Sequence, residues 1–481
     1  MQPQRAQLRK VMRETFGVKN LREGQEEVMQ SVLKGQNTLA IMPTGAGKSL
    51  YFQLPALLMP GTTIVVSPLI ALELNSSLPQ AEQALNVKAA AGGKTDFLYV
   101  TPERLTKPTF LQSIRKMKID LVVIDEAHCV SQWGHDFRPA YLALRDVLTT
   151  LGNPPVLALT ATATEDVIED IEKQLALKDL RVFKSGVLRD NLHYETVHVE
   201  KETDKPERLV ELLKSTPGNG IIYCATIKMV EETTEFLKSR GLSVTRYHGK
   251  LPAKERHLNQ DLFMQGDVPL IVATNAFGMG IDKSNIRFVI HLQFPGSLEA
   301  YYQESGRAGR DGEDSRCILF YLRQDKRTQS FFLAGKYPKP DDIRAVFTRL
   351  KSLSENGLDI NHADLTKDLE VAPTKLRVIL TAMKEAGFLT GKRQSWVLHK
   401  PHLTEGDLAH LVDEYQRLRE SDQEKLKQII VYSQTALCRW KFLLRYFGQE
   451  VDWQCCGHCD NCHKEASHLV EPNLQITAVA V

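Results

Sequence analysis

The sequence lacks any apolar run that could cross a bilayer and lacks a large excess of charge of one sign. Its longest apolar runs, such as residues 61–70, contain Ser67 and Pro68 and are about ten residues long, whereas a membrane-spanning helix needs about 20. Lys and Arg number 61 against 59 Asp and Glu, and no stretch forms a basic tail or arm, so any nucleic-acid affinity must come from local patches. No apolar stretch follows the charged first ten residues, so we expect no signal peptide and predict a cytoplasmic location, nucleoid-associated if the source is bacterial.

Cysteine is scarce except near the end of the chain, where five of the eight cysteines fall between residues 438 and 462. In a reducing compartment such clustering indicates a metal before it indicates disulfides. A C-x₂-C-x₂-C run lets thiolates converge on Zn²⁺ at about 2.3 Å, with a distant fourth cysteine. Cys455, next to Cys456, is a further cysteine that this set does not need, and His458 is an alternative ligand. The predicted ligands of a closed, structural zinc site are Cys438, Cys456, Cys459 and Cys462.

The chain of 481 residues is too long for one core and predicts roughly three domains. Up to residue 335, short uncharged runs rich in β-branched residues alternate with amphipathic helical patterns. This alternation is typical of buried parallel strands in α/β layers. Two series of runs predict two α/β lobes, with strands at 38–42, 62–67, 120–124 and 156–160, then at 220–224, 269–274, 288–292 and 315–321.

The pattern becomes helical after Gly335, beyond a linker at residues 336–340. Two amphipathic helices, a turn and a strand-like stretch within residues 341–400 predict a winged-helix-like segment. A charged helical pair then leads into the cysteines. We therefore predict an α/β protein with lobes at 1–188 and 189–335, a winged-helix-like domain at 336–402, a helical zinc-binding subdomain at 403–465 and a tail at 466–481.

The run at residues 38–42 leads directly into Pro43-Thr44-Gly45-Ala46-Gly47-Lys48-Ser49, and a helix can begin at Leu50. A glycine-rich turn between strand and helix exposes backbone N–H groups that cradle phosphate oxygens. An ordinary tight turn is the alternative, which this context disfavours. In this pattern Lys48 reaches the β- and γ-phosphates and Ser49 ligates Mg²⁺. The predicted contacts to the phosphates and their metal are Thr44, Gly45, Gly47, Lys48 and Ser49.

A second apolar run, residues 121–124, ends at Asp125-Glu126-Ala127-His128. A carboxylate at the end of a buried strand beside the phosphate loop can hold Mg²⁺ through water, and we assign this role to Asp125. Glu126 can polarise the attacking water as general base, and His128 can couple nucleotide state to nucleic-acid contacts. A helix cap is the alternative for such a tetrapeptide alone. Together with the phosphate loop, the motif predicts a nucleotide hydrolase.

These ordered motifs resemble superfamily 2 helicases, and RecQ-type DNA helicases in particular, over roughly residues 10–335 and the cysteine-rich segment. The resemblance implies two RecA-like lobes that hydrolyse ATP. Arg22 and Gln25 stand at matching positions of the family's adenine-reading motif. A carboxamide offers a donor and an acceptor to an adenine edge, which suits Gln25. Val18 stands where the family often has an aromatic residue.

Residues 129–139 resemble the aromatic-rich loop that RecQ enzymes place just after this acidic motif. Trp133 and Phe137 offer faces on which bases can stack, and Arg138 adds a cation. Aromatic core residues are the alternative, but the polar residues between them favour a loop. The predicted DNA contacts are His128, Gln132, Trp133, Phe137 and Arg138.

The second lobe carries Arg307 and Arg310, whose planar guanidinium groups suit the charge that develops on a γ-phosphate. A solvated helix face is the alternative. The resemblance makes Arg310 the expected arginine finger, Arg307 a supporting phosphate contact and Gln303 a group that positions water or phosphate. Residues 273–282 resemble the family motif that bridges ATP and the strand backbone, and Asp282 is expected to pair with the arginines or the ribose.

Two features depart from the usual family order. The winged-helix-like segment precedes the zinc segment, and residues 463–481 are too few for the winged helix that usually follows it. Glu73 alone joins two stretches that the family separates by a helix and most of a strand. Because parallel strands need a crossover of about a dozen residues, we expect the first lobe to have lost a unit or rerouted its chain.

The sequence thus predicts an ATP-dependent DNA helicase with DNA-stimulated ATPase activity. By resemblance, it moves 3′→5′ and acts in recombination and repair. The predicted cofactors are ATP, Mg²⁺ and Zn²⁺. The predicted partners are single-stranded and duplex DNA and a single-strand-binding protein or other repair proteins, with no membrane. An RNA helicase is an alternative that the aromatic-rich loop and the zinc segment disfavour. A DNA-binding or annealing protein with a damaged motor is another.

Overall fold

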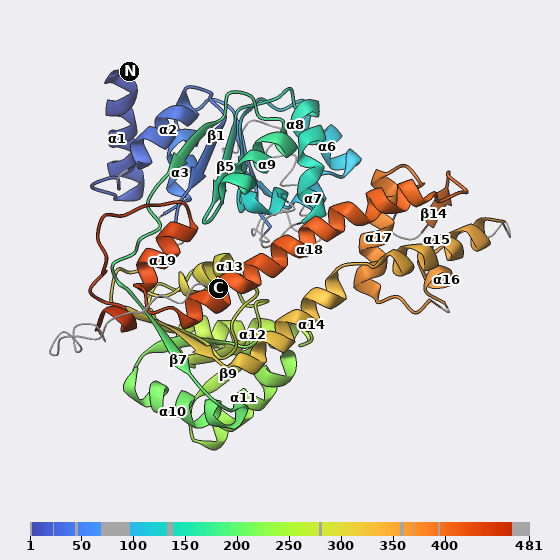
Figure 1. Ribbon diagram of the computed structural model, residues 1–481. Coiled ribbons are helices and arrows are strands. Elements are labelled where there is room, and N and C mark those ends of the chain that lie inside the picture. Colours follow the sequence, from blue (N-terminus) through green and yellow to red (C-terminus); the bar gives the residue numbers. More distant parts are fainter. Residues whose placement is uncertain are drawn as a thin grey trace. The chain divides into compact units, whose positions relative to one another are not determined.

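The computed structural model describes residues 2–22, 24–43, 47–68, 97–131, 138–278, 281–355, 360–367, 369–392 and 395–463 (Figure 1). The chain forms two compact units. The first comprises Met1–Phe294, Glu299–Tyr321 and Tyr432–Val481, and the second comprises Pro295–Leu298 and Leu322–Val431. No helix within the described ranges is long and apolar enough to span a membrane.

The first sheet is parallel, with six strands in the order β3-β2-β4-β5-β1-β6. Successive residues of a strand face opposite sides, so Leu39 and Ile41 join one core cluster while Ala40 and Met42 join another. The strands are β1 (Thr38–Ile41), β2 (Thr62–Val66), β3 (Phe97–Val100), β4 (Ile119–Ile124), β5 (Val156–Thr160) and β6 (Arg181–Lys184). Its helical elements are α1 (Gln2–Phe16), α2 (Gln25–Leu33), α3 (Leu50–Ala56), α5 (Pro102–Leu105), α6 (Pro108–Ile114), η1 (Ala127–Val130), α7 (Pro139–Leu142), α8 (Leu144–Thr150) and α9 (Glu165–Leu175).

The second sheet is also parallel, with six strands in the order β7-β12-β11-β8-β10-β9. Its strands are β7 (Leu192–His198), β8 (Asn219–Tyr223), β9 (Val244–Tyr247), β10 (Leu270–Ala273), β11 (Ile286–His291) and β12 (Ser315–Tyr321). The accompanying helices are η2 (Glu202–Asp204), α10 (Lys205–Ser215), α11 (Ile227–Ser239), α12 (Ala253–Gln265) and α13 (Leu298–Ser305), and the first unit also contains α19 (Arg439–Tyr446). The predicted α/β class with two parallel-sheet lobes is confirmed.

All eight predicted strands are present, and the four strands that the pattern missed are the edges of the two sheets, β3, β6, β7 and β9. An edge strand has one neighbour and is partly exposed, so it tolerates polar residues that interrupt an apolar run. Arg181 and Lys184 in β6 and His193 and Glu195 in β7 are such residues. The expected loss of a unit at Glu73 lies outside the described residues; β2 and β3, on either side of it in the chain, pair in parallel.

The second unit contains the segment predicted to be winged-helix-like. It is built from η3 (Arg323–Asp325), α14 (Lys326–Lys336), α15 (Pro340–Glu355), α16 (His362–Thr366), α17 (Pro373–Glu385), β13 (Leu389–Lys392), β14 (Ser395–Leu398) and most of α18 (Glu405–Gln434). β13 and β14 form an antiparallel hairpin. Ile343 and Leu350 of α15, Leu376 of α17 and Leu389 of β13 share one core with Leu408 of α18. Four helices (α15, α16, α17 and α18) and a hairpin therefore enclose a core of their own. The predicted domain bounds remain predictions.

We predict that Gly220→Ala destabilises the second lobe. A Cβ at Gly220 would lie 1.9 Å from Cε2 of Phe288, a fully buried ring on the neighbouring strand β11. Neither the ring nor the strand can move without disturbing the sheet, so we expect a loss of about 1–3 kcal/mol or more in unfolding free energy, measured by urea denaturation. Gly249→Ala is the control, because no atom lies within 4 Å of its Cβ position. Equal losses in the two variants would contradict the packing argument.

Candidate nucleotide site and zinc centre

The phosphate loop follows β1 in the interior of the first sheet, where Met42 N donates to Thr160 O (2.9 Å). Thr44, Gly45 and Ala46 lie outside the described residues. Gly47 has a φ of +76°, a left-handed conformation that favours glycine, and Lys48 and Ser49 lead into α3. The sequence therefore places a glycine where the loop must turn into the helix.

The adenine-motif residue Gln25 lies beside this loop. A Cβ at Gly47 would be 3.7 Å from Gln25 Nε2. Gln25 is buried, and its Oε1 accepts a hydrogen bond from Arg22 N (2.8 Å). Burial raises the pKa of Tyr51 to about 12, against the lowering effects of a hydrogen bond with Gln25 and the charge of Arg22. The structure therefore brings the two predicted nucleotide-contacting segments together and adds Tyr51, which the sequence pattern did not indicate.

Asp125 is held at the carboxyl end of β4. Ser67 Oγ donates to its Oδ2 (3.1 Å), and Glu126 N donates to its Oδ1 (3.0 Å). Burial raises the pKa of Asp125 above its ordinary value, the charge of Glu126 raises it further, and the charge of Lys48 lowers it. A half-buried carboxylate with an acidic neighbour and a lysine within electrostatic reach fits a Mg²⁺ site, since a dication offsets the desolvation of both acids.

Glu126 has a φ of +49°, a strained value for a residue other than glycine. Such strain is concentrated at functional sites. Its Oε2 is buried and accepts no hydrogen bond from the part of the chain described, although His128 Nδ1 lies 3.4 Å away. The predicted role of Glu126 as general base stays a prediction.

A hydrogen-bonded chain begins at His128, whose Nδ1 lies 3.4 Å from Glu126 Oε2. The His128 ring is buried, and its Nδ1 lies 3.0 Å from Thr160 Oγ1. Thr160 Oγ1 also donates to Thr162 O (3.0 Å), so the His128 tautomer with its proton on Nδ1 is the one that satisfies both contacts. The acidic motif and the Leu159–Ala163 segment are thereby joined. Gln132, Trp133 and Phe137 lie outside the described residues; Arg138 is half-buried, and its N–H donates to Cys129 O (3.0 Å).

In the second lobe, both predicted arginines lie in the turn after α13. Arg307 is buried and donates through Nη1 to Gly278 O, and a Cβ at Gly278 would lie 2.9 Å from its Nη2. Arg310 Nη1 donates to Asp282 Oδ1 (2.5 Å). Burial lowers the pKa of Arg310 and the Asp282 carboxylate raises it. Both arginines therefore contact the segment at residues 274–282. Gln303 is half-buried on α13, and the phosphate roles of these residues stay predictions.

The four predicted zinc ligands converge. Their sulfur atoms all lie within 4.8 Å of one another, with Cys459 and Cys462 Sγ 3.4 Å apart and Cys456 and Cys462 Sγ 3.9 Å apart. Four sulfurs at about 2.3 Å from a tetrahedral Zn²⁺ lie about 3.8 Å apart, so the cluster fits that ion. Cys455 is exposed and lies outside the cluster, and the half-buried His458 is not part of the cluster either.

Two backbone N–H groups support this cluster. Cys456 N donates to Cys438 Sγ (3.3 Å), and Arg439 N donates to Cys459 Sγ (3.4 Å). Donors of this kind stabilise the thiolate form that binds a metal. Both the ligands and their supporting donors therefore favour a structural zinc site.

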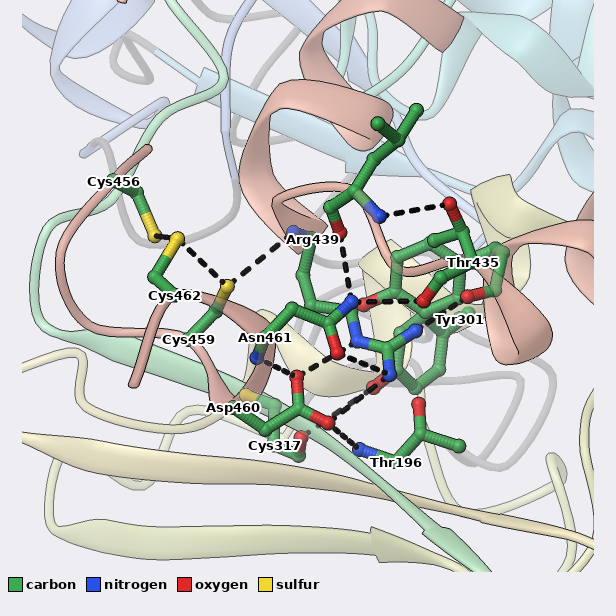
Figure 2. Close-up of polar contacts among 12 residues, drawn as sticks. Thr196, Tyr301, Cys317, Thr435, Arg439, Cys456, Cys459, Asp460, Asn461 and Cys462 are labelled. Atoms are coloured by element: carbon green, nitrogen blue, oxygen red, sulfur yellow. Dashed lines mark hydrogen bonds and ion pairs between the residues drawn. The ribbon is translucent and has the colours of Figure 1, made fainter. Parts of the chain in front are cut away.

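A buried ion pair that the sequence analysis did not indicate ties the zinc segment to the second lobe (Figure 2). Arg439 Nε and Nη2 donate to the two carboxylate oxygens of Asp460 at 2.8 and 3.0 Å, and Asp460 Oδ2 also accepts from Thr196 N (3.0 Å). Trp440 Nε1 donates to Leu192 O (3.0 Å). Thr196 and Leu192 belong to β7, an edge strand that pairs with β12 on one side only. The zinc segment therefore provides hydrogen-bond partners for backbone groups of β7 that the sheet does not pair.

Two parallel sheets, a phosphate loop beside a strand-end Asp-Glu pair and an arginine-bearing turn define a two-lobed helicase-type ATPase with a zinc centre. Family comparison agrees: residues 22–171 match the DEAD/DEAH box helicase family, residues 204–312 the helicase conserved C-terminal domain and residues 402–463 the RecQ zinc-binding family. The chain belongs to the RecQ family, and ATP, Mg²⁺ and Zn²⁺ are its cofactors.

Two relatives in Bacillus subtilis (strain 168) cover nearly the whole chain. The probable ATP-dependent DNA helicase RecS is 33% identical over 475 residues, which are 94% of this chain and 92% of the relative. The ATP-dependent DNA helicase RecQ is 35% identical over 480 residues, 96% of this chain and 68% of the relative. Among solved structures, Mycobacterium smegmatis helicase Lhr bound to ssDNA and AMP-PNP has a similar fold, with a TM-score of 0.55 and 19% identity over 85% of this chain and 61% of that one.

We predict that Cys459→Ser abolishes stoichiometric zinc binding, because the variant removes the buried thiolate nearest Cys462. Zinc content would be measured by mass spectrometry of the purified full chain. Cys455→Ser is the matched control, since Cys455 lies outside the cluster, and it should retain one zinc per chain. Loss of zinc in the control with retention in Cys459→Ser would show that the ligand set is wrong.

Proposed function

We propose that this chain, an ATP-dependent DNA helicase of the RecQ family, moves 3′→5′ along one strand and separates duplex DNA in recombination and repair. The observation that carries the proposal is the contiguous set Asp125, Glu126, His128 and Thr160 beside the phosphate loop. Membership of the RecQ family supports DNA as the substrate, and the relatives' names identify them as DNA helicases. Polarity and biological role rest on family resemblance.

In the proposed reaction the first lobe binds and activates the nucleotide. Lys48 places positive charge at the β- and γ-phosphates, and Gln25 contacts the base. Mg²⁺ bound through Ser49 and water on Asp125 would neutralise phosphate charge. Glu126 accepts a proton from the water that attacks the γ-phosphorus, while the bond from that phosphorus to the ADP oxygen breaks. The buried Oε2 of Glu126 suits this step.

The second lobe supplies the cation for the transition state. Arg310 stabilises the charge that develops on the γ-phosphoryl oxygens, which requires its guanidinium to exchange the exposed Asp282 carboxylate for phosphate. Arg307 donates to the Gly278 carbonyl and so orders residues 273–282, which resemble the motif that bridges ATP and the strand backbone. Hydrolysis removes the anion that both lobes bind, which permits the lobes to separate and close again one step along the strand.

DNA contact is assigned to the segment after the acidic motif. His128 connects Glu126 to this segment and to Thr160, so a change at the γ-phosphate reaches both. Trp133 and Phe137 offer stacking faces, with Gln132 and Arg138 as polar contacts. Single-stranded and duplex DNA are the proposed substrates, a single-strand-binding protein or other repair proteins are proposed partners, and the cytoplasm remains the predicted location.

We predict that Glu126→Gln lowers DNA-stimulated ATP hydrolysis by at least about 100-fold, because the amide cannot accept the proton from water. Binding of a fluorescent ATP analogue should remain, since Lys48 and Gln25 are unchanged. Glu165→Gln is the control, as Glu165 is an exposed residue at the start of α9 that pairs with Lys184 in the same lobe, and its rate should match the parent. Unimpaired hydrolysis in Glu126→Gln would refute the assignment of the base.

Strand displacement on tailed duplexes tests the motor itself. We expect ATP-dependent unwinding of duplexes with a 3′ single-stranded tail and little unwinding of those with a 5′ tail, with Lys48→Ala as the inactive control. Preference for the 5′ tail would overturn the polarity. Intact DNA-stimulated hydrolysis without displacement of either substrate would instead favour a DNA-binding or annealing protein.

A further inference from the structure

We infer that Arg189, in the segment that joins the two sheets, is a positioning residue that orients Arg310 for ATP hydrolysis. The inference rests on the proposed role of Arg310. Arg189 lies between β6 and β7, at residues where the sequence indicated only a boundary between lobes.

The Arg189 guanidinium binds three carbonyl oxygens of the turn that carries both arginines. Nη1 donates to Gly306 O (2.8 Å), and Nη2 donates to Ala308 O (2.9 Å) and Gly309 O (2.5 Å). The carbonyl dipoles at the end of α13 point toward one place, where a cation is stabilised. The planar fork of arginine can reach several oxygens at once, which a lysine ammonium cannot do with the same geometry.

Asn191, two residues after Arg189, also holds the turn that carries Arg310. Gly309 has a φ of +57°, and Asn191 Nδ2 donates to both Gly309 O (2.8 Å) and Glu313 O (2.9 Å). A Cβ at Gly309 would lie 2.4 Å from that nitrogen. Because Arg310 follows Gly309 directly, the contacts of Arg189 and Asn191 set the direction in which the Arg310 side chain leaves the backbone.

The charges at the turn agree with this arrangement. The positive charges of Arg307 and Arg189 lower the pKa of Arg310, after the larger effect of burial, while Asp282 raises it. Arg189 is therefore close enough for its charge to act on Arg310. Its three carbonyl acceptors hold it on the backbone side of the turn, and the Arg310 guanidinium binds the Asp282 carboxylate.

The joining segment is also bound at its other end to the phosphate-binding strand. Ser185 N donates to Ile41 O (3.1 Å), and Ile41 is the last residue of β1 before the phosphate loop. Between the two ends, Val187 O accepts from Tyr302 of α13 (2.6 Å). A short stretch of chain, residues 185–189, thus runs from the end of β1 to the turn that bears Arg310.

The test measures steady-state ATP hydrolysis by the full chain with saturating single-stranded DNA. For Arg189→Ala we expect kcat to fall about tenfold or more, because a misplaced group loses transition-state contact. KM for ATP should change by less than about twofold, because Lys48 and Gln25 are intact. Arg189→Lys keeps the positive charge but lacks the planar guanidinium group, so it should recover part of the rate. It replaces Arg189→Ala in the test if the alanine variant fails to fold.

Arg316→Ala is the matched control for a structural effect. Arg316 lies on β12 of the same lobe and pairs with Glu195 (2.7 Å), so its removal should lower the melting temperature but leave kcat near that of the parent. An equal fall in kcat in this control would show that any loss of a lobe-two arginine slows the enzyme, and the inference would be overturned.

A double-mutant cycle separates this inference from the proposed role of Arg310. If Arg189 acts through Arg310, the loss from Arg189→Ala should shrink to less than about twofold when Arg310→Ala is already present. Independent, multiplying losses would overturn the inference while leaving Arg310 as the finger. Unchanged kcat in Arg310→Ala alone would refute the role of Arg310, and Arg189 would then have no finger to position.

Discussion

The parallel alignment of β2, β4, β5 and β1 is the constraint on which the nucleotide site depends. In parallel strands all carboxyl ends emerge at the same edge of the sheet, where ligands bind. The register pairs Val66 with Ile124 and Ile41 with Thr160. Ser67 and Asp125 therefore leave their strands side by side, and the phosphate loop starts next to Thr160.

The contacts of the acidic motif follow from that register. Ser67 reaches Asp125 because their strands are neighbours, and His128 reaches Thr160 because the η1 turn brings the ring back over β5. The strained backbone of Glu126 occurs at the point where the chain reverses from β4 into η1. The register of the parallel strands therefore positions the side chains of the site. The packing of the surrounding core offsets the energetic cost of the positive φ of Glu126.

The packing of the second lobe depends on contacts between residues far apart in the chain. Its edge strand β7 is closed by Trp440 and Asp460 from the zinc segment, more than two hundred residues away in the chain. The buried pair of Arg439 and Asp460 is adjacent to Cys438 and Cys459, so metal binding and lobe packing support each other. Zinc bound by these cysteines would stabilise the joint between the zinc segment and the second lobe, which agrees with a structural role.

The sequence by itself determined the central strands, the phosphate loop, the Asp125-Glu126 pair and the four zinc cysteines. Each of these is a local pattern whose chemistry follows from residue type and spacing. The tertiary structure alone decided the edge strands, the Arg439–Asp460 pair and the three-carbonyl contact of Arg189. These depend on which distant segments of the chain come into contact. The local pattern of apolar and polar residues does not indicate which residue a buried arginine will bind.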